Sequence, residues 1–137
     1  MGISQPAEHT GITRRPWRWV LLIAAVIAHL VVLYIPTVPS TGGITVPGAD
    51  KAVHVLIFGA VMLTGLRAGI RALPLAIGLT AHAVVSEVIQ HLALENRAGD
   101  PGDVIANLAG IAVGWYLAGM ISRHRTGAEQ PPSASAR

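Results

Sequence analysis

The sequence predicts an all-α, polytopic membrane protein with four transmembrane helices and both termini in the cytoplasm. Hydrophobic residues make up 52% of the 137 residues and charged residues only 12%, which is typical of lipid-embedded chains. Four apolar stretches approach or exceed the roughly 20 residues that a helix needs to cross a bilayer. Most basic residues lie at span ends that would be on the same side of the membrane. This bias predicts which side of the membrane the two termini occupy.

The first apolar stretch covers about 17–35 and follows a polar segment, 1–16, for which we predict a disordered cytoplasmic tail. Arginines before an apolar run also occur in cleaved signal peptides. Because the apolar part of a signal peptide usually ends after about 7–15 residues, the longer run here favours an anchored span. Trp17 and Trp19 suit the inner interface of the membrane, and Tyr34 suits the outer one.

Three further spans are predicted, each after residues that favour a loop or a turn. A loop rich in Pro and Gly precedes the second span, and a Gly-Asp-Pro-Gly turn precedes the fourth. Asp50 and Asp103 stand just before these two spans, where aspartate is a preferred N-cap. The Pro- and Ser-rich segment 122–137 predicts a disordered cytoplasmic tail. The spans cover about 52–70, 72–94 and 104–121, within one membrane domain, 17–121.

The distribution of Lys and Arg predicts the orientation of the chain. With the N-terminus inside, only Lys51 and Arg97 of these ten residues lie on the outer side, which follows the positive-inside rule. Because the basic residues are scattered at span ends rather than clustered, nucleic acid is not an expected partner. We therefore predict a multi-pass protein of the cell membrane. The inner basic residues are Arg14, Arg15, Arg18, Arg67, Arg71, Arg123, Arg125 and Arg137.

Polar residues occur at helical spacing near the outer ends of three predicted helices. On the second helix, Asp50 and His54 are four positions apart and therefore lie on one face. The polar residues of the third helix also lie on one face of that helix, as do those of the fourth. Polar faces inside a membrane are expected to face one another rather than lipid. The sequence therefore predicts an outward-facing ligand-binding site. Its residues are Asp50, Lys51, His54, Glu87, Gln90, Arg97, Asp103 and Asn107.

Glu87 is the strongest single candidate for a functional residue because it lies within the predicted hydrocarbon core of the membrane. An ionised carboxylate there costs about 2.5–3.5 kcal/mol, so it must pair, take up a proton or line a wet cavity. One interpretation makes Glu87 a catalytic residue with His54 as its partner. The other is structural, with a protonated Glu87 hydrogen-bonded to Gln90, Asn107 or a histidine. The sequence leaves both open.

Metal binding is not predicted. Histidine and carboxylate side chains are zinc ligands, but the chain has neither an HExxH motif nor a His-x-x-x-His pair. The absence of cysteine excludes thiolate ligands and disulfides. We therefore expect no metal and no cofactor, and interpret His29 and His82, which lie off the polar faces, as packing residues.

Small residues recur every four positions along the fourth predicted span. This spacing places them on one side of a helix, where the absence of large side chains lets a second helix approach closely. The sequence predicts that this side is a helix-packing face. Its residues are Ala106, Gly110, Gly114 and Ala118.

The polar residues, taken in order, resemble the motifs of the VanZ-like family of small integral membrane proteins. The resemblance covers about 50–114 and rests on Asp50-Lys51-x-x-His54, Glu87-x-x-Gln90, Arg97 and Asp103-x-x-x-Asn107-x-x-Gly110-x-x-x-Gly114. It implies a membrane protein of the cell envelope. The family takes its name from a protein linked to low-level resistance to teicoplanin, a lipid-tailed glycopeptide, although many members occur outside resistance clusters.

Three functions follow from this pattern. The favoured one is a non-catalytic protein that binds a membrane lipid, a lipid-linked envelope precursor or a lipoglycopeptide, with Arg97 and Lys51 meeting an anionic head group. The alternative is a membrane-embedded enzyme with Glu87 as general base, His54 as its partner, and Asn107 or Arg97 stabilising negative charge. A proton-coupled carrier ranks last because four helices would have to form a homo-oligomer, and the sequence leaves the oligomeric state open.

Overall fold

The computed structural model describes residues 15–34, 47–93 and 100–128, and the regular secondary structure in these ranges is helical. Each of its four helices is long and apolar enough to cross a membrane, which confirms the all-α prediction and indicates a multi-pass membrane protein. Large apolar side chains also point outward, as lipid-facing residues must; Leu56 and Leu92 are 68% and 77% exposed. The helices are α1 (Trp17–Tyr34), α2 (Ala49–Ala68), α3 (Ala72–Ala93) and α4 (Pro101–Ala128).

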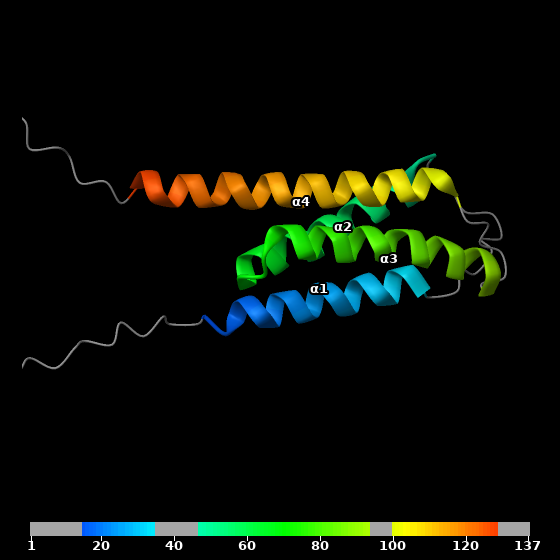
Figure 1. Ribbon diagram of the computed structural model, residues 1–137, viewed down its shortest axis with the longest axis horizontal. Helices are drawn as coiled ribbons and strands as arrows, with labels where there is room; N and C mark the ends of the chain where they lie inside the picture. The colour runs from blue at the N-terminus through cyan, green and yellow to red at the C-terminus, as the bar shows by residue number, and fades with distance from the viewer. Residues whose placement is uncertain (1–14, 35–46, 94–99, 129–137) are drawn as a thin grey trace, which may run out of the picture.

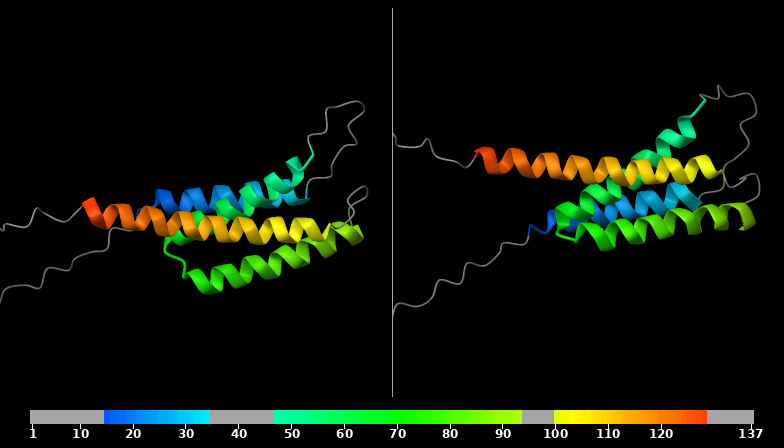
Figure 2. Two further views of the ribbon diagram at one scale, coloured as in Figure 1. Left: turned by 90° about the horizontal axis from the view of Figure 1, so that it is seen from above. Right: turned by 45° about the horizontal axis from the view of Figure 1, so that its top comes forward.

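Helix α2 holds the bundle together. It crosses the other helices obliquely and contacts all three of them, most extensively α4 (Figure 2). Helix α1 begins and α4 ends at the same end of the bundle (Figure 1). The start of α2 and the start of α4 therefore lie together at the opposite end.

The contact between α2 and α4 depends on small residues. A Cβ atom on Gly110 would overlap the carbonyl oxygen of Val55, and one on Gly114 would overlap the carbonyl oxygen of Gly59. The backbone of α2 therefore lies against α4 where α4 carries no side chain, at Gly110 and Gly114. Ala106 and Ala118, the other two residues of the predicted packing face, are also buried.

A tight reversal joins α2 to α3. Gly69 ends α2 with φ of 98°, a left-handed conformation that glycine adopts without steric cost. Its N–H donates to Leu66 O at 3.1 Å and the N–H of Ile70 donates to Gly65 O at 3.0 Å, the two hydrogen bonds of a Schellman motif. The chain then enters α3 at Ala72, so the two helices run in opposite directions.

The helix starts differ from the predicted ones, and both N-cap predictions are wrong. Helix α2 already begins at Ala49, after Gly48, so that Asp50 lies inside the first turn. Helix α4 begins at Pro101, where proline is favoured because its missing N–H needs no partner. Asp103 therefore also lies in the first turn rather than before it. The carboxylate that accepts from a free N–H is that of Asp100, whose Oδ1 lies 2.7 Å from Gly102 N.

Helix α4 continues to Ala128, beyond the end expected at 121. The hydroxyl of Ser122 donates to Ala118 O at 3.0 Å, within the helix, and the polar turns that follow extend past the apolar part. The start of the predicted C-terminal tail is thus helical. The remainder of that tail and most of the predicted N-terminal tail lie outside the described residues, as does most of the loop between α1 and α2.

The two histidines off the polar faces pack in the middle of the bundle. His29 is buried, with its ring 4.5 Å from the Phe58 ring and 5.1 Å from the His82 ring, measured between centroids. Phe58 is fully buried and belongs to the apolar core. These rings thus join α1, α2 and α3.

Candidate functional site

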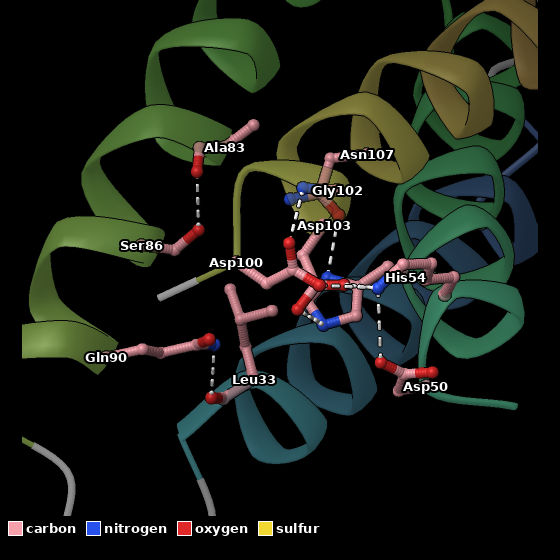
Figure 3. A network of polar contacts seen from close by, with 11 residues as sticks. Leu33, Asp50, His54, Ala83, Ser86, Gln90, Asp100, Gly102, Asp103 and Asn107 are labelled. Carbon is pink, nitrogen blue, oxygen red and sulfur yellow. Dashed lines mark hydrogen bonds and ion pairs between the residues drawn. The ribbon is translucent and has the colours of Figure 1, made fainter. Parts of the chain in front are cut away.

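A group of buried and half-buried polar side chains lies where the starts of α2 and α4 meet α3, and we call it the polar centre; Figure 3 shows His54, Asp100, Asp103 and Asn107 of this group. Its ionisable and amide groups come from three helices and from the residue before α4. Several of them are nearly inaccessible to solvent inside a bundle whose exterior is apolar. The polar centre consists of Lys51, His54, Glu87, Asp100, Asp103 and Asn107.

Lys51 ties α2 to the start of α4. Its Nζ lies 2.6 Å from Asp100 Oδ2 and 3.3 Å from Asp103 Oδ1. The Lys51 ammonium, together with the N–H of Gly102, holds the pKa of Asp100 below its ordinary value of 3.8. Asp50, on the exposed side of α2, lies 3.5 Å from the same ammonium.

His54 joins α2 to α4 deeper in the bundle. Its Nδ1 lies 2.8 Å from Oδ1 of the fully buried Asn107, so the ring nitrogen donates and the amide oxygen accepts. The other ring nitrogen, Nε2, lies 3.7 Å from Asp103 Oδ2. The hydrogen bond to Asn107 therefore fixes both the tautomer and the orientation of the imidazole.

Glu87 extends from α3 into the same space. It is only 7% exposed, and neither of its carboxylate oxygens has a hydrogen-bond partner among the described residues. The structural interpretation of Glu87, a hydrogen bond to Gln90, Asn107 or a histidine, is therefore wrong within this part of the chain. Asn107 Nδ2 is likewise buried without a partner there. Buried polar atoms without partners are costly, which points to something that completes them.

Gln90 belongs to a different contact. Its Nε2 donates to the carbonyl oxygen of Leu33 at 3.0 Å, which ties α3 to the last turn of α1 (Figure 3). Carbonyl groups in the last turn of a helix lack an intrahelical partner, so a buried amide there satisfies one of them. His91, four residues after Glu87 on α3, is exposed.

The structure brings together most of the predicted site residues. Five of the eight belong to the polar centre, Asp50 lies at its exposed edge and Gln90 lies on the side of α1. Arg97, the eighth, lies outside the described residues. The site residues that the structure describes therefore lie close together. Lys51 was expected to meet an anionic head group, but its ammonium is already paired with Asp100 and Asp103.

Asp100 is the residue that the sequence reasoning missed. It lies in the Gly-Asp-Pro-Gly turn before α4, where it contacts Lys51 and accepts the N–H of Gly102. The sequence does indicate this role, since an aspartate directly before proline is the usual beginning of a helix with proline at its first position.

A cavity of about 330 Å³ lies at the other end of the bundle. It lies between the start of α1, the end of α2 and the second half of α4, and its polar lining includes Arg18, Arg67 and Ser122. Arg18 Nη1 donates to Arg67 O at 3.2 Å. By contrast, His54, Glu87, Asp103 and Asn107 are buried, so the polar centre is closed in this conformation.

The polar centre offers two kinds of chemistry. Glu87, His54 and Asp103 each place one acceptor atom within 4.8 Å of the others, which suits a cation or a shared proton. A carboxylate next to an imidazole can also transfer a proton. No family model, curated protein or solved structure matches this chain, so the functional argument rests on its own residues.

Proposed function

We propose that the chain is a cell-envelope membrane protein that binds a lipophilic or lipid-linked ligand at its polar centre. One observation carries the proposal, namely that Glu87 and Asn107 Nδ2 are buried without partners among the described residues. Intramembrane groups of this kind are costly to keep and commonly belong to functional sites.

The charge distribution supports an orientation with both termini in the cytoplasm. The end of the bundle where α1 begins and α4 ends carries Arg15, Arg18, Arg67, Arg71 and Arg123, and the polar centre lies at the opposite end (Figure 1). Under the positive-inside rule the arginine end faces the cytoplasm. The polar centre then faces the outer side of the membrane.

The chemistry of the polar centre favours a neutral head group with hydroxyl or amide groups. The Glu87 oxygens accept hydrogen bonds and Asn107 Nδ2 donates one, so a group that does both would satisfy them. A purely anionic head is disfavoured, because three carboxylates surround the centre and the Lys51 ammonium is already paired. We therefore replace the anionic head group expected from the sequence with a hydroxyl- or amide-bearing one.

Entry of a ligand requires local opening. The start of α2 and the start of α4 are held together by the ion pairs of Lys51, and these groups are half-exposed, with side-chain exposures of 42% for Lys51 and 47% for Asp100. Ion pairs between groups of such exposure are screened by solvent and contribute little to stability, so they can separate at little cost. A lipid approaching from the bilayer would reach the centre through this contact.

Native mass spectrometry of the gently extracted protein tests the proposal. We expect a co-purified lipid of defined mass in the wild type and in His124→Ala, which changes an exposed side chain near the end of α4, far from the polar centre. Glu87→Ala should lose it, because the acceptor pair is gone. If wild type and Glu87→Ala carry the same lipids in the same amounts, the polar centre is not the binding site.

A second candidate function is an enzyme that acts on such a lipid. It is favoured by the adjacent positions of Glu87 and His54, whose acceptor atoms lie within 4.8 Å and which could pass a proton between ligand and protein. Glu87→Gln would then still bind lipid but accumulate an unreacted species of different mass. An unchanged lipid mass in Glu87→Gln would favour binding without catalysis.

The resemblance to the VanZ-like family adds a link to glycopeptide resistance as a part of this proposal. A lipid-tailed glycopeptide carries amide and hydroxyl groups on a membrane-anchored molecule, which fits the ligand chemistry above. Expression of the chain should raise the inhibitory concentration of teicoplanin more than that of a glycopeptide without a lipid tail. Equal or absent shifts for the two antibiotics would remove the resistance role and leave lipid binding to be judged separately.

A further inference from the structure

His54, Glu87 and Asp103 are placed as the three protein ligands of one metal ion. Each contributes one atom, and these atoms lie within 4.8 Å of one another, although the residues come from α2, α3 and α4. We propose that the polar centre binds a divalent transition-metal ion of the zinc type. This goes beyond ligand binding and stands whether or not a lipid binds there.

The imidazole of His54 has the tautomer and the fixed orientation that a metal ligand needs. Its Nδ1 donates to Asn107 Oδ1 at 2.8 Å, so the proton is on Nδ1 and the lone pair is on Nε2. Metal-binding histidines almost always donate their other N–H to a carbonyl or carboxylate in this way, which fixes the ring. Asn107 is fully buried and therefore holds the ring in one place.

The carboxylates of Glu87 and Asp103 leave negative charge that a bound cation can neutralise. Lys51 compensates Asp100, its nearer partner at 2.6 Å, and reaches Asp103 only through Oδ1 at 3.3 Å. Asp103 Oδ2 faces His54 instead, and Glu87 has no partner among the described residues. A divalent cation bound to Glu87 and Asp103 gives a neutral unit, which lowers the cost of holding two carboxylates in a bundle surrounded by lipid.

The spacing is close to that of a coordination shell. Ligand atoms about 2.0–2.2 Å from zinc stand roughly 3.3–3.6 Å apart at the corners of a tetrahedron. The distance between His54 Nε2 and Asp103 Oδ2 is 3.7 Å, within a few tenths of an ångström of that edge. Glu87, held by no other hydrogen bond in the described part, can close the rest of the distance by side-chain rotation.

The donor set selects the class of metal. One imidazole nitrogen with carboxylate oxygens suits zinc and neighbouring transition metals, whereas magnesium and calcium prefer oxygen ligands alone. Three protein ligands leave one position of a tetrahedron open, as in catalytic rather than structural zinc sites. A hydroxyl of the proposed ligand, or water, would fill that position.

The competing occupant is a proton. A protonated Glu87 or an imidazolium at His54 would also reduce the charge of the group, and neither needs a metal. The two cases differ for Glu87→Gln, because the amide resembles the protonated acid but is a poor metal ligand. If the occupant is a proton, Glu87→Gln should be well tolerated. If the occupant is a metal ion, Glu87→Gln should lose it.

The test measures metal content of the detergent-purified full chain, isolated with an affinity tag that contains no histidine. We expect about one zinc ion per chain in wild type and in His124→Gln, which changes an exposed histidine near the end of α4, and a loss of stoichiometric metal in His54→Gln and Glu87→Gln. Asn107→Ala, which removes only the support of the imidazole, should weaken zinc affinity about 10–100-fold.

Thermal unfolding supplies a second readout that does not depend on how the variants were purified. Added zinc should raise the unfolding midpoint of wild type and His124→Gln and leave that of Glu87→Gln unmoved. A folded wild type that holds no stoichiometric metal, with a midpoint that zinc does not change, would overturn the proposal in favour of a proton. Metal retained equally in His54→Gln and Glu87→Gln would overturn it as well. Lipid that stays bound to a metal-free wild type would keep the proposed function while the metal site fails.

Discussion

Gly110 of α4 lies against Val55 of α2, so that the backbone of one helix touches the backbone of the other. A Cβ atom built on Gly110 would also lie 3.0 Å from Val55 Cα and 3.1 Å from Gly59 N, in addition to overlapping the Val55 carbonyl oxygen. Because backbone atoms cannot rotate away as a side chain can, this contact sets the distance between α2 and α4. Asn107 and Asp103 of the polar centre lie within two turns of Gly110, nearer the start of α4, and the geometry of the centre depends on that distance.

Gly110→Ala should therefore destabilise the protein by about 1–3 kcal/mol, the usual cost of forcing extra atoms into a packed contact. Gly119→Ala is the matched control, since it lies on the same helix and a Cβ there meets nothing within 4 Å. The control should be neutral or up to about 1 kcal/mol more stable, because alanine favours helix over glycine. Unfolding in mixed micelles measures both, and equal stabilities would contradict the close contact.

Asn107→Ala should lower the free energy of unfolding by about 1–3 kcal/mol, because it leaves a buried imidazole N–H without its acceptor. The expectation follows from the 2.8 Å contact between His54 Nδ1 and Asn107 Oδ1 and from the complete burial of Asn107. Thr64→Ala provides the comparison, since its hydroxyl donates to backbone carbonyl oxygens of its own helix, those of Ala60 and Val61.

The two variants should also differ in what they do to the polar centre. Asn107→Ala frees the His54 ring, so its imidazole resonances in an NMR spectrum of the detergent-solubilised protein should shift or broaden. Thr64→Ala should leave them in place. A stability loss in Asn107→Ala no larger than in Thr64→Ala would show that the hydrogen bond contributes little.

The pairing of Lys51 with Asp100 predicts a pH dependence. The pKa of Asp100 is lowered in the folded protein, first by the Lys51 ammonium and then by the Gly102 N–H. A carboxyl group with a lowered folded pKa stabilises the protein above its unfolded value, here 3.8, and loses this contribution as pH falls through the folded pKa. The stabilisation is thus complete at neutral pH and disappears only in acid below 3.8.

Asp100→Asn isolates this effect, since asparagine can still accept the N–H of Gly102 but carries no charge. Wild type should unfold at a higher temperature than Asp100→Asn at neutral pH, and the difference should shrink as pH falls below 3.8. Unfolding midpoints recorded across this range measure it. A difference that stays constant into strong acid would mean that the charge of Asp100 does not contribute.

The sequence predicted the helices because hydropathy is averaged over whole spans. It placed Asp50 and His54 on one helix face, and Asp103 and Asn107 on another, because the spacing of each pair matches the helical repeat. It could not find the partner of Gln90, which is a backbone carbonyl of α1, since no side-chain pattern marks such an acceptor. It placed the starts of α2 and α4 a few residues late, because apolar content does not reveal where a polar first turn begins. The cavity beside Arg18 depends on how the helices cross, which spacing along one chain does not determine.

The orientation can be tested with single cysteines, because the natural sequence contains none. Pro47 lies just before α2, at the end of the bundle that holds the polar centre, and His124 lies near the end of α4 at the other end; both are exposed. With both termini in the cytoplasm, a membrane-impermeant maleimide should label Pro47→Cys in intact cells. His124→Cys should react only after the cells are made permeable. The reverse pattern would place the polar centre at the cytoplasmic face, where an envelope precursor still under assembly, rather than a ligand arriving from outside, would be the molecule it meets.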